Sequence, residues 1–168
     1  NKGLEAIEAR WLFNLSPEQI EVVIHPQSII HSIVQFVDGS MKAQMSLPDM
    51  RYPILFALSY PKRYKSHLPR LNFSVYQQLT FEKPDTETFP CLELALYALK
   101  RGGNIPCVLN AANEEAVKAF LYDKIKFYDI PQIIEKMITT SIYIKCPTIE
   151  DYIECDQETR KKVQELIK

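Results

Sequence analysis

Glycine is scarce in this chain, with 4 residues among 168. The sequence contains no Gly-x-Gly-x-x-Gly turn, the pattern that lets a backbone approach a dinucleotide pyrophosphate. No apolar run reaches the roughly 20 residues that a helix needs to cross a bilayer, and the N-terminus lacks the charged-then-apolar pattern of a secretory signal. The sequence therefore predicts neither a dinucleotide-binding turn nor a membrane partner.

A surplus of either charge is also missing, since 20 Lys and Arg face 21 Asp and Glu. The basic residues are scattered, so there is no electrostatic footprint for nucleic acid. Hydrophobic residues make up 46% of the chain, which suits one or two small globular units with a sizeable core. We expect a globular protein that does not bind nucleic acid.

The cysteines do not form a metal or disulfide pattern. Cys91, Cys107, Cys146 and Cys155 are irregularly spaced and include no Cys-x-x-Cys pair. Structural zinc and a disulfide framework are both poorly supported by such spacing. We expect buried free thiols in a reducing compartment.

The opening residues carry an amide, an ammonium and a carboxylate. Lys2 and Glu5 are three residues apart and Asn1 and Glu5 four apart, so a helix places them on one face. Free N–H groups at a helix N-terminus, with a lysine beside them, favour a phosphate, and a carboxylate one turn further in can hold a divalent cation. The alternative is a solvated first turn with a Lys–Glu pair worth about 0.3 kcal/mol.

Local patterns predict the elements that follow this turn. Apolar spacing predicts a helix over residues 3–13. The SPEQ run at residues 16–19 combines a serine N-cap, a proline and a capping-box glutamine, which predicts a short helical turn. β-branched residues over 21–25 predict a strand that Pro26 stops.

A hairpin is predicted next, with strands over 29–37 and 40–46 joined by a tight turn at Asp38-Gly39. The second strand alternates, which predicts one buried face formed by Met41, Ala43 and Met45. The first strand is apolar on both faces, so both faces need a cover. Because homodimer interfaces resemble a domain core cut in half, we expect a homodimer through this sheet.

Helical patterns dominate the rest of the chain, apart from an irregular linker over 62–89 that includes a short strand at 79–81. A helix over 52–60 precedes the linker. After it, apolar spacing predicts helices over 92–101 and 110–122, the first stopped by Gly102-Gly103. Capping patterns at Asp129 and Thr148 begin two more helical segments.

These predictions define an α+β protein. A β-hairpin-containing sheet packed with helices occupies residues 1–61, the linker residues 62–89, and a small helical bundle residues 90–168. The chain does not begin with Met, and its first residues carry the candidate site. We therefore expect it to be a piece of a longer polypeptide.

Several long motifs give the chain a resemblance to a known family. They are NKGLE at 1–5 with IEARWLF at 7–13, IHPQSIIHS at 24–32, PDMR at 48–51, LTF at 79–81 with FPC at 89–91, and LNAANE at 109–114. In these motifs the chain closely resembles 1-deoxy-D-xylulose 5-phosphate reductoisomerase. The motifs follow the order that they have in the family and extend over nearly the whole chain. Long motifs in register are far harder to match by chance than one short motif.

The resemblance implies an oxidoreductase of non-mevalonate isoprenoid biosynthesis. Family members rearrange and reduce 1-deoxy-D-xylulose 5-phosphate to 2-C-methyl-D-erythritol 4-phosphate with NADPH and a divalent cation, Mg²⁺, Mn²⁺ or Co²⁺. They have a dinucleotide-binding domain, a catalytic domain and a helical domain. The resemblance places residues 1–61 in the second half of the catalytic domain and residues 90–168 in the helical domain.

Residue by residue, the resemblance makes Asn1 and Lys2 ligands of the substrate phosphate. Glu5 matches a metal-ligating carboxylate that also lies against substrate oxygens. It is therefore expected both to bind the metal and to bind the substrate. No other metal ligand, no catalytic residue and no NADPH-binding residue has a counterpart in this sequence. One carboxylate is a poor cation site alone, so we expect the 168 residues to be inactive without the rest of such an enzyme.

Three further residues, Pro48, Met50 and His31, keep alternative interpretations. Pro48 and Met50 resemble a loop near nicotinamide and substrate, and an ordinary turn after the hairpin fits them equally well. His31 matches a family histidine, but a hydrogen bond to neighbouring backbone is as good an explanation. We expect a structural role for His25 and a surface position for His67.

A second function class is a non-catalytic dimerisation module, whose opening Lys and Glu are only solvated. What precedes Asn1 in the full gene distinguishes the two, since an enzyme needs an upstream Asp-x-Glu pair and a glycine-rich fingerprint. For the enzyme, we expect a bacterial cytoplasmic location, with a plastid stroma as the alternative.

Overall fold

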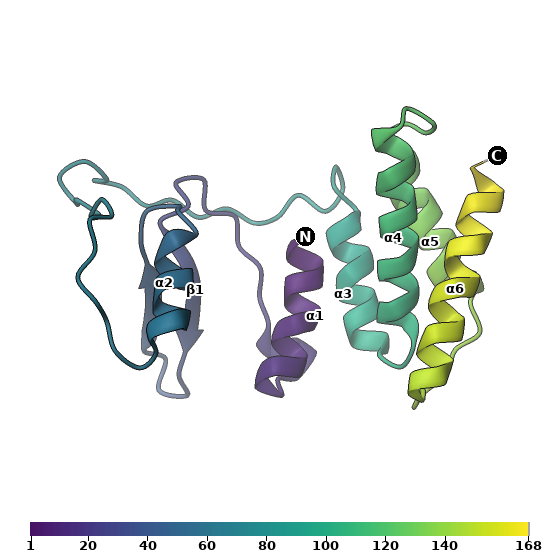
Figure 1. The fold of residues 1–168 in the computed structure, drawn as a ribbon, viewed down its shortest axis with the longest axis horizontal. Coiled ribbons are helices and arrows are strands. Elements are labelled where there is room, and N and C mark those ends of the chain that lie inside the picture. The colour runs from purple at the N-terminus through teal and green to yellow at the C-terminus, as the bar shows by residue number, and fades with distance from the viewer. Residues whose placement is uncertain (168) are drawn as a thin grey trace. The chain divides into compact units, whose positions relative to one another are not determined.

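A computed structural model describes residues 1–167 and confirms the α+β prediction (Figure 1). The elements in chain order are α1 (Lys2–Phe13), the 3₁₀ turn η1 (Pro17–Gln19), β1 (Ile30–Gln35), β2 (Met41–Met45), α2 (Arg51–Ser59), α3 (Cys91–Arg101), α4 (Ile105–Leu121), α5 (Asp129–Thr140) and α6 (Ile149–Leu166). Contacts group residues 23–84 into one unit, and residues 1–22 with the chain from 85 onward into another. Within the described residues, no helix is long and apolar enough to span a membrane.

The hairpin unit confirms the turn prediction. β1 and β2 pair antiparallel, with Val34 opposite Lys42. The turn is held by Asp38, whose carboxylate accepts hydrogen bonds from the Ser40 backbone N–H at 2.9 Å and hydroxyl at 2.6 Å. Gly39 has φ +84°, a backbone conformation that favours glycine. These local bonds explain why a short sequence pattern was enough to place the turn.

The predicted strand over 21–25 is wrong. The structure has a single isolated bridge, in which Ile24 and Glu82 exchange two backbone hydrogen bonds of 2.9 Å. Proline lacks the N–H that a ladder needs, and Pro26 and Pro84 each follow the bridge by two residues. The short strand predicted at 79–81 is also absent. The residue that bridges to Ile24 is Glu82, one position beyond the predicted range, and Pro84 follows it.

Burial on the hairpin also differs from the prediction. Met41 is 61% exposed and Ala43 is exposed, while Met45 is half-buried. Val34 on β1 and Phe36, which follows β1, are exposed too. The alternation that predicted a buried face is present, but no element of residues 1–167 covers it fully.

Helix α2 follows the hairpin as predicted. Asp49 precedes it and accepts hydrogen bonds from the Arg51 backbone N–H at 2.9 Å and from the Arg51 guanidinium at 2.5 Å. These bonds hold the pKa of the Asp49 carboxyl below its usual value. An acidic side chain at the start of a helix also complements the helix dipole.

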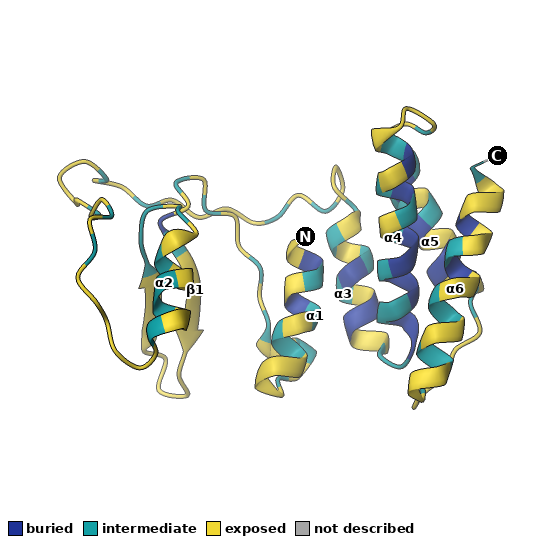
Figure 2. Ribbon diagram, viewed as in Figure 1, coloured by how far each residue is buried: buried dark blue, intermediate teal, exposed yellow. Residues whose placement is uncertain are grey.

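The helical unit confirms the predicted bundle and adds α1 to it. Helix α4 packs against α3, α5 and α6, and Figure 2 shows the buried residues concentrated on these helices. The core consists of Ala95, Ala98, Ile105, Val108, Leu109, Ala112, Ala116, Ile130, Ile134, Met137, Ile138 and Val163. Helix α1 packs on α3, and the Arg10 guanidinium donates to the Leu99 carbonyl. The predicted domain ranges 1–61, 62–89 and 90–168 stay a prediction.

Helix ends follow their capping signals at α3 and α6, but not at α5. The predicted cap Asp129 is the first residue of α5, after the N-cap Tyr128, and its carboxylate accepts from the Lys126 N–H at 2.7 Å. α3 ends at Gly102 with φ +65°, and α6 begins at Thr148, which accepts from Asp151 N–H at 3.2 Å while its own N–H donates to the Asp151 carboxylate at 2.8 Å. α4 begins at Ile105, five residues before the predicted start. Pro106 lies in its first turn, where proline needs no hydrogen-bond partner and is favoured.

Candidate functional site

The opening turn of α1 brings the three predicted site residues together. The Asn1 side-chain amide donates to Glu5 Oε1 at 2.6 Å, and Lys2 Nζ donates to Glu5 Oε2 at 2.6 Å. The side chains of Lys2 and Glu5 are 64% and 46% exposed, so solvent and solutes can reach them. Both carboxylate oxygens are thus engaged by neighbouring donors that could equally turn to a ligand.

The surroundings of this turn favour an anion. Asn1 is the N-cap of α1 and makes no side-chain capping bond, and the first N–H groups of any α-helix have no intrahelical acceptor. The positive end of the helix dipole, the Lys2 ammonium and the Asn1 amide therefore lie together. Such a group of donors can bind a phosphate.

A cavity of about 230 Å³ lies beside the turn. Its walls come from α1 and its N-cap, from α3 and the residue two positions before it, from α4 and from α5: Asn1, Lys2, Gly3, Leu4, Phe89, Cys91, Leu92, Ala95, Leu109, Asn113 and Ile134. Three of the motifs that carried the resemblance, at residues 1–5, 89–91 and 109–114, thus meet at one cavity. The local sequence patterns did not indicate Asn113 and Phe89, because only the packing of the helices brings these residues to the same cavity as Lys2.

The turn supplies only part of a metal site. Glu5 contributes a carboxylate, the hard oxygen donor that Mg²⁺ and Mn²⁺ prefer. Between residues 1 and 167, no group of three or more His, Cys, Asp or Glu side chains is arranged to hold a metal. The donor type fits a divalent cation, and the other ligands would have to come from elsewhere.

The histidines have structural hydrogen bonds. His31 Nε2 lies 2.9 Å from Ser46 Oγ and 3.2 Å from the Ser46 carbonyl, across the hairpin. His25 Nδ1 lies 2.8 Å from the Thr80 carbonyl, and its ring stacks on Phe81 with centroids 4.9 Å apart. His67 is exposed. The predicted structural role of His25 fits these contacts.

The loop residues Pro48 and Met50 are both exposed. They belong to the hairpin unit and flank Asp49, whose carboxylate accepts from the Arg51 backbone N–H at the start of α2. Their contacts therefore fit a turn after the hairpin, and the role near nicotinamide that the resemblance implies stays a prediction.

All four cysteines are free, as predicted, but not all are buried. Cys107 and Cys155 are half-buried, whereas Cys91 and Cys146 are exposed. Burial raises the pKa of the Cys107 thiol to about 11. The expectation of four buried thiols is wrong because Cys91 opens α3 at the cavity wall and Cys146 lies in the exposed loop before α6.

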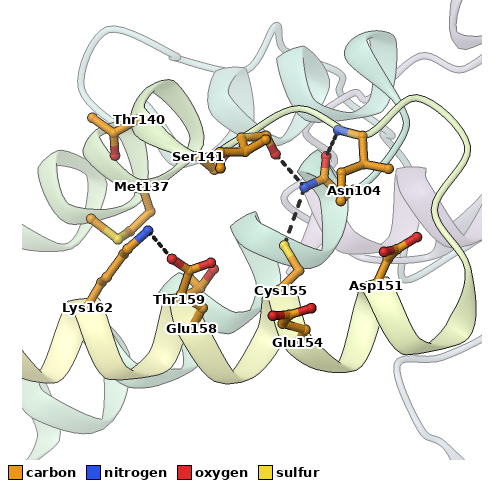
Figure 3. Close-up of a pocket in the computed structure, with 12 residues that line it drawn as sticks. Asn104, Met137, Thr140, Ser141, Asp151, Glu154, Cys155, Glu158, Thr159 and Lys162 are labelled. Atoms are coloured by element: carbon orange, nitrogen blue, oxygen red, sulfur yellow. Dashed lines mark hydrogen bonds and ion pairs between the residues drawn. The ribbon is translucent and has the colours of Figure 1, made fainter.

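A second cavity, of about 210 Å³, lies between α5, α6 and the loop that joins them (Figure 3). Asn104 lines it and is 1% exposed. Its amide donates to the Ile142 carbonyl at 2.8 Å, its oxygen accepts from Ile144 N–H at 2.9 Å, and its amide also lies 3.4 Å from Cys155 Sγ. These bonds fasten the loop to the start of α4, so Asn104 has a structural role.

The fold and the opening turn define a class of protein: an α+β protein in which an amide, an ammonium and a carboxylate meet at the N-terminus of a helix that packs on a helical bundle. A family model described as the DXP reductoisomerase C-terminal domain matches residues 45–162. The chain belongs to the DXP reductoisomerase family.

Individual relatives agree with this assignment. The chain is 56% identical over 167 residues to a 1-deoxy-D-xylulose 5-phosphate reductoisomerase from Phocaeicola vulgatus, covering 99% of the chain and 44% of the relative. A solved reductoisomerase from Zymomonas mobilis in complex with NADPH is similar at 46% identity and TM-score 0.92, over 100% of this chain and 44% of that one. A reductoisomerase solved with NADPH, fosmidomycin and magnesium is similar at 41% identity and TM-score 0.90, over 99% and 43%. The chain thus spans less than half the length of these relatives, and the non-catalytic module is not favoured.

Proposed function

We propose that this chain is part of an NADPH-dependent reductoisomerase that rearranges and reduces 1-deoxy-D-xylulose 5-phosphate to 2-C-methyl-D-erythritol 4-phosphate, in non-mevalonate isoprenoid biosynthesis. The observation that carries the proposal is the opening turn, where Asn1, Lys2 and Glu5 converge within 2.6 Å hydrogen bonds. Family membership supplies the reaction. The bacterial origin of the relatives supports a cytoplasmic location for the whole enzyme.

The three residues have different roles in this proposal. Lys2 and Asn1 release Glu5 and turn to the substrate phosphate, where the ammonium and the amide both make charge-assisted hydrogen bonds to the anion. Glu5 then supplies one carboxylate ligand to the cation and lies against substrate oxygens. The same pair of donors that neutralises Glu5 in the free protein thus binds the anion in the complex.

The cation, when bound, polarises the ketone and hydroxyl oxygens of the substrate. Glu5 would hold it together with ligands from the rest of the enzyme, because a single carboxylate leaves most positions of an octahedral shell unfilled. NADPH would bind to the part of the enzyme outside this chain, since the resemblance assigns no residue of this chain to the nucleotide site. The relative solved with NADPH, fosmidomycin and magnesium supports both ligands.

Replacing Lys2 by Met in the full-length enzyme should raise KM for the sugar phosphate roughly 10- to 100-fold, the value of a lost hydrogen bond to a charged group. KM for NADPH should stay unchanged, because Lys2 contacts only the phosphate. Steady-state kinetics with each substrate varied in turn measures both constants.

The control for this substitution is Lys118→Met, which removes an exposed lysine near the end of α4. Its KM for the sugar phosphate should match that of the unaltered enzyme. An unchanged KM in Lys2→Met would contradict the phosphate role and leave only a solvated helix start.

We further propose a homodimer through the hairpin. Val34 of β1, Met41 of β2 and Phe36 in the turn between them are large apolar side chains, and all three are exposed in the single chain. Apolar surface of this kind on a sheet fits a self-associating interface. Pairing with a second copy would cover the faces whose alternation predicted burial.

Val34→Lys should convert the full-length dimer into a monomer, because a charge buried in an apolar interface lacks a partner. Val34 is 57% exposed in the single chain. The matched control is Val75→Lys, at a valine that is 70% exposed and lies outside the hairpin; this variant should remain dimeric. Sedimentation velocity at micromolar concentration measures both, and a monomeric unaltered protein would rule the interface out.

A further inference from the structure

Gly3, between the candidate phosphate ligands and Glu5, faces Ala95 of α3 with no room for a side chain. It is buried, in the first turn of α1. A Cβ built on Gly3 would lie 2.3 Å from the Cβ of Ala95, and its next neighbours would be Ala95 Cα at 3.8 Å and the Cys91 carbonyl oxygen at 3.9 Å. Carbon atoms in contact normally lie about 3.5–4.0 Å apart. The obstacle is therefore a single methyl group.

The methyl group of Ala95 cannot move aside. It has no rotatable bond of its own, and α3 is anchored in the core by Ala98 and Leu99, which are 0% and 1% exposed. The opening turn of α1 is the freer partner, because the side chains of Lys2 and Glu5 are largely exposed. A side chain at position 3 would therefore push this turn away from α3, by about 1.2–1.7 Å if the 2.3 Å distance is to reach ordinary contact.

We propose that Gly3 is a positioning residue for the reaction: its contact with Ala95 seats the opening turn on the helical bundle, and so sets where Asn1, Lys2 and Glu5 meet the substrate. This inference rests on the proposed function. It gives the bundle a part in substrate binding through α3, although none of the three ligands lies on that helix. Misplacement of a binding group by about 1 Å can cost roughly 100-fold in rate.

The test exchanges the methyl group between the helices in the full-length enzyme. Gly3→Ala should raise KM for the sugar phosphate roughly 10- to 100-fold, with KM for NADPH unchanged. Ala95→Gly alone should raise KM for the sugar phosphate much less than Gly3→Ala, because it loosens the contact without pushing the opening turn away from α3. The double variant Gly3→Ala, Ala95→Gly should recover most of the lost affinity, since the new methyl group then has its nearest neighbour at the 3.8 Å distance of Ala95 Cα.

A second variant and a binding measurement keep the test decisive if Gly3→Ala folds poorly. Ala95→Ser adds one atom from the opposite side of the same contact, and it should also weaken binding of the sugar phosphate, measured by calorimetry without NADPH. A normal KM in Gly3→Ala, or a defect that Ala95→Gly does not relieve, would overturn the positioning role. Failure of the proposed function is distinguishable, because the unaltered full-length protein would then turn over no substrate at all.

Discussion

Replacing Glu5 by Gln in the full-length enzyme is expected to lower turnover by more than about 100-fold, because even the neighbours that orient metal ligands are worth 10- to 100-fold. Glutamine keeps the shape of the side chain and one acceptor for the 2.6 Å hydrogen bonds from Asn1 and Lys2. It removes the negative charge that makes the group a metal ligand. The loss should therefore come from the chemistry and leave folding intact.

A Mn²⁺ titration separates this explanation from a general defect. Turnover of Glu5→Gln, followed as NADPH oxidation, should need a higher metal concentration than that of the unaltered enzyme. The control is Glu8→Gln, an exposed carboxylate one turn further along α1, which should show normal turnover and metal response. If Glu5→Gln behaves like Glu8→Gln, the opening turn is only a solvated helix start, and this result would favour the non-catalytic dimerisation module over the enzyme.

Elements with local signals were predictable. The Asp38-Gly39 turn is held by bonds to Ser40, and α6 begins with the reciprocal bonds of Thr148 and Asp151. Each signal involves residues at most three positions apart. The candidate ligands Asn1, Lys2 and Glu5 were also predictable, because the spacing of an α-helix alone brings their side chains together.

Elements that depend on distant partners were not predictable. Residues 21–25 have the composition of a strand, but only Ile24 finds a partner, 58 residues away at Glu82. The exposed hairpin faces show the same limit, because their pattern predicts burial without indicating which surface provides it. The cavity beside Lys2 likewise required the packing of α3 and α4, although the family motifs at 89–91 and 109–114 had already included Phe89 and Asn113.

The glycine pair Gly102-Gly103 has both a local role, which the sequence predicted, and a long-range role, which only the structure shows. Gly102-Gly103 predicted the end of α3 correctly. The structure adds that a Cβ on Gly103 would lie 2.3 Å from the Ile144 carbonyl oxygen, so this glycine also admits the loop after α5. That loop is then fastened by Asn104, next in the sequence, whose backbone N–H donates to the Ile144 carbonyl at 3.1 Å.

Asn104→Ala should therefore destabilise the bundle, by about 3 kcal/mol. It removes the side-chain partners of the Ile142 carbonyl and the half-buried Ile144 N–H, and a buried polar group left without a partner costs about 1–3 kcal/mol. The residue is 1% exposed, so water reaches the gap poorly. Hydrogen exchange of the full-length protein should show protection in α4 and α6 falling roughly 100-fold, as this free energy requires.

Asn110→Ala is the matched control for this change. Asn110 lies on the same helix, and its amide makes one long hydrogen bond of 3.5 Å to Glu114. Alanine is the better helix former at that position, so protection should stay the same or rise. Equal protection in the two variants would mean that the loop is held by packing around Ile144 and not by the Asn104 amide, and the Gly103 contact would then be the main fastening of the loop to α4.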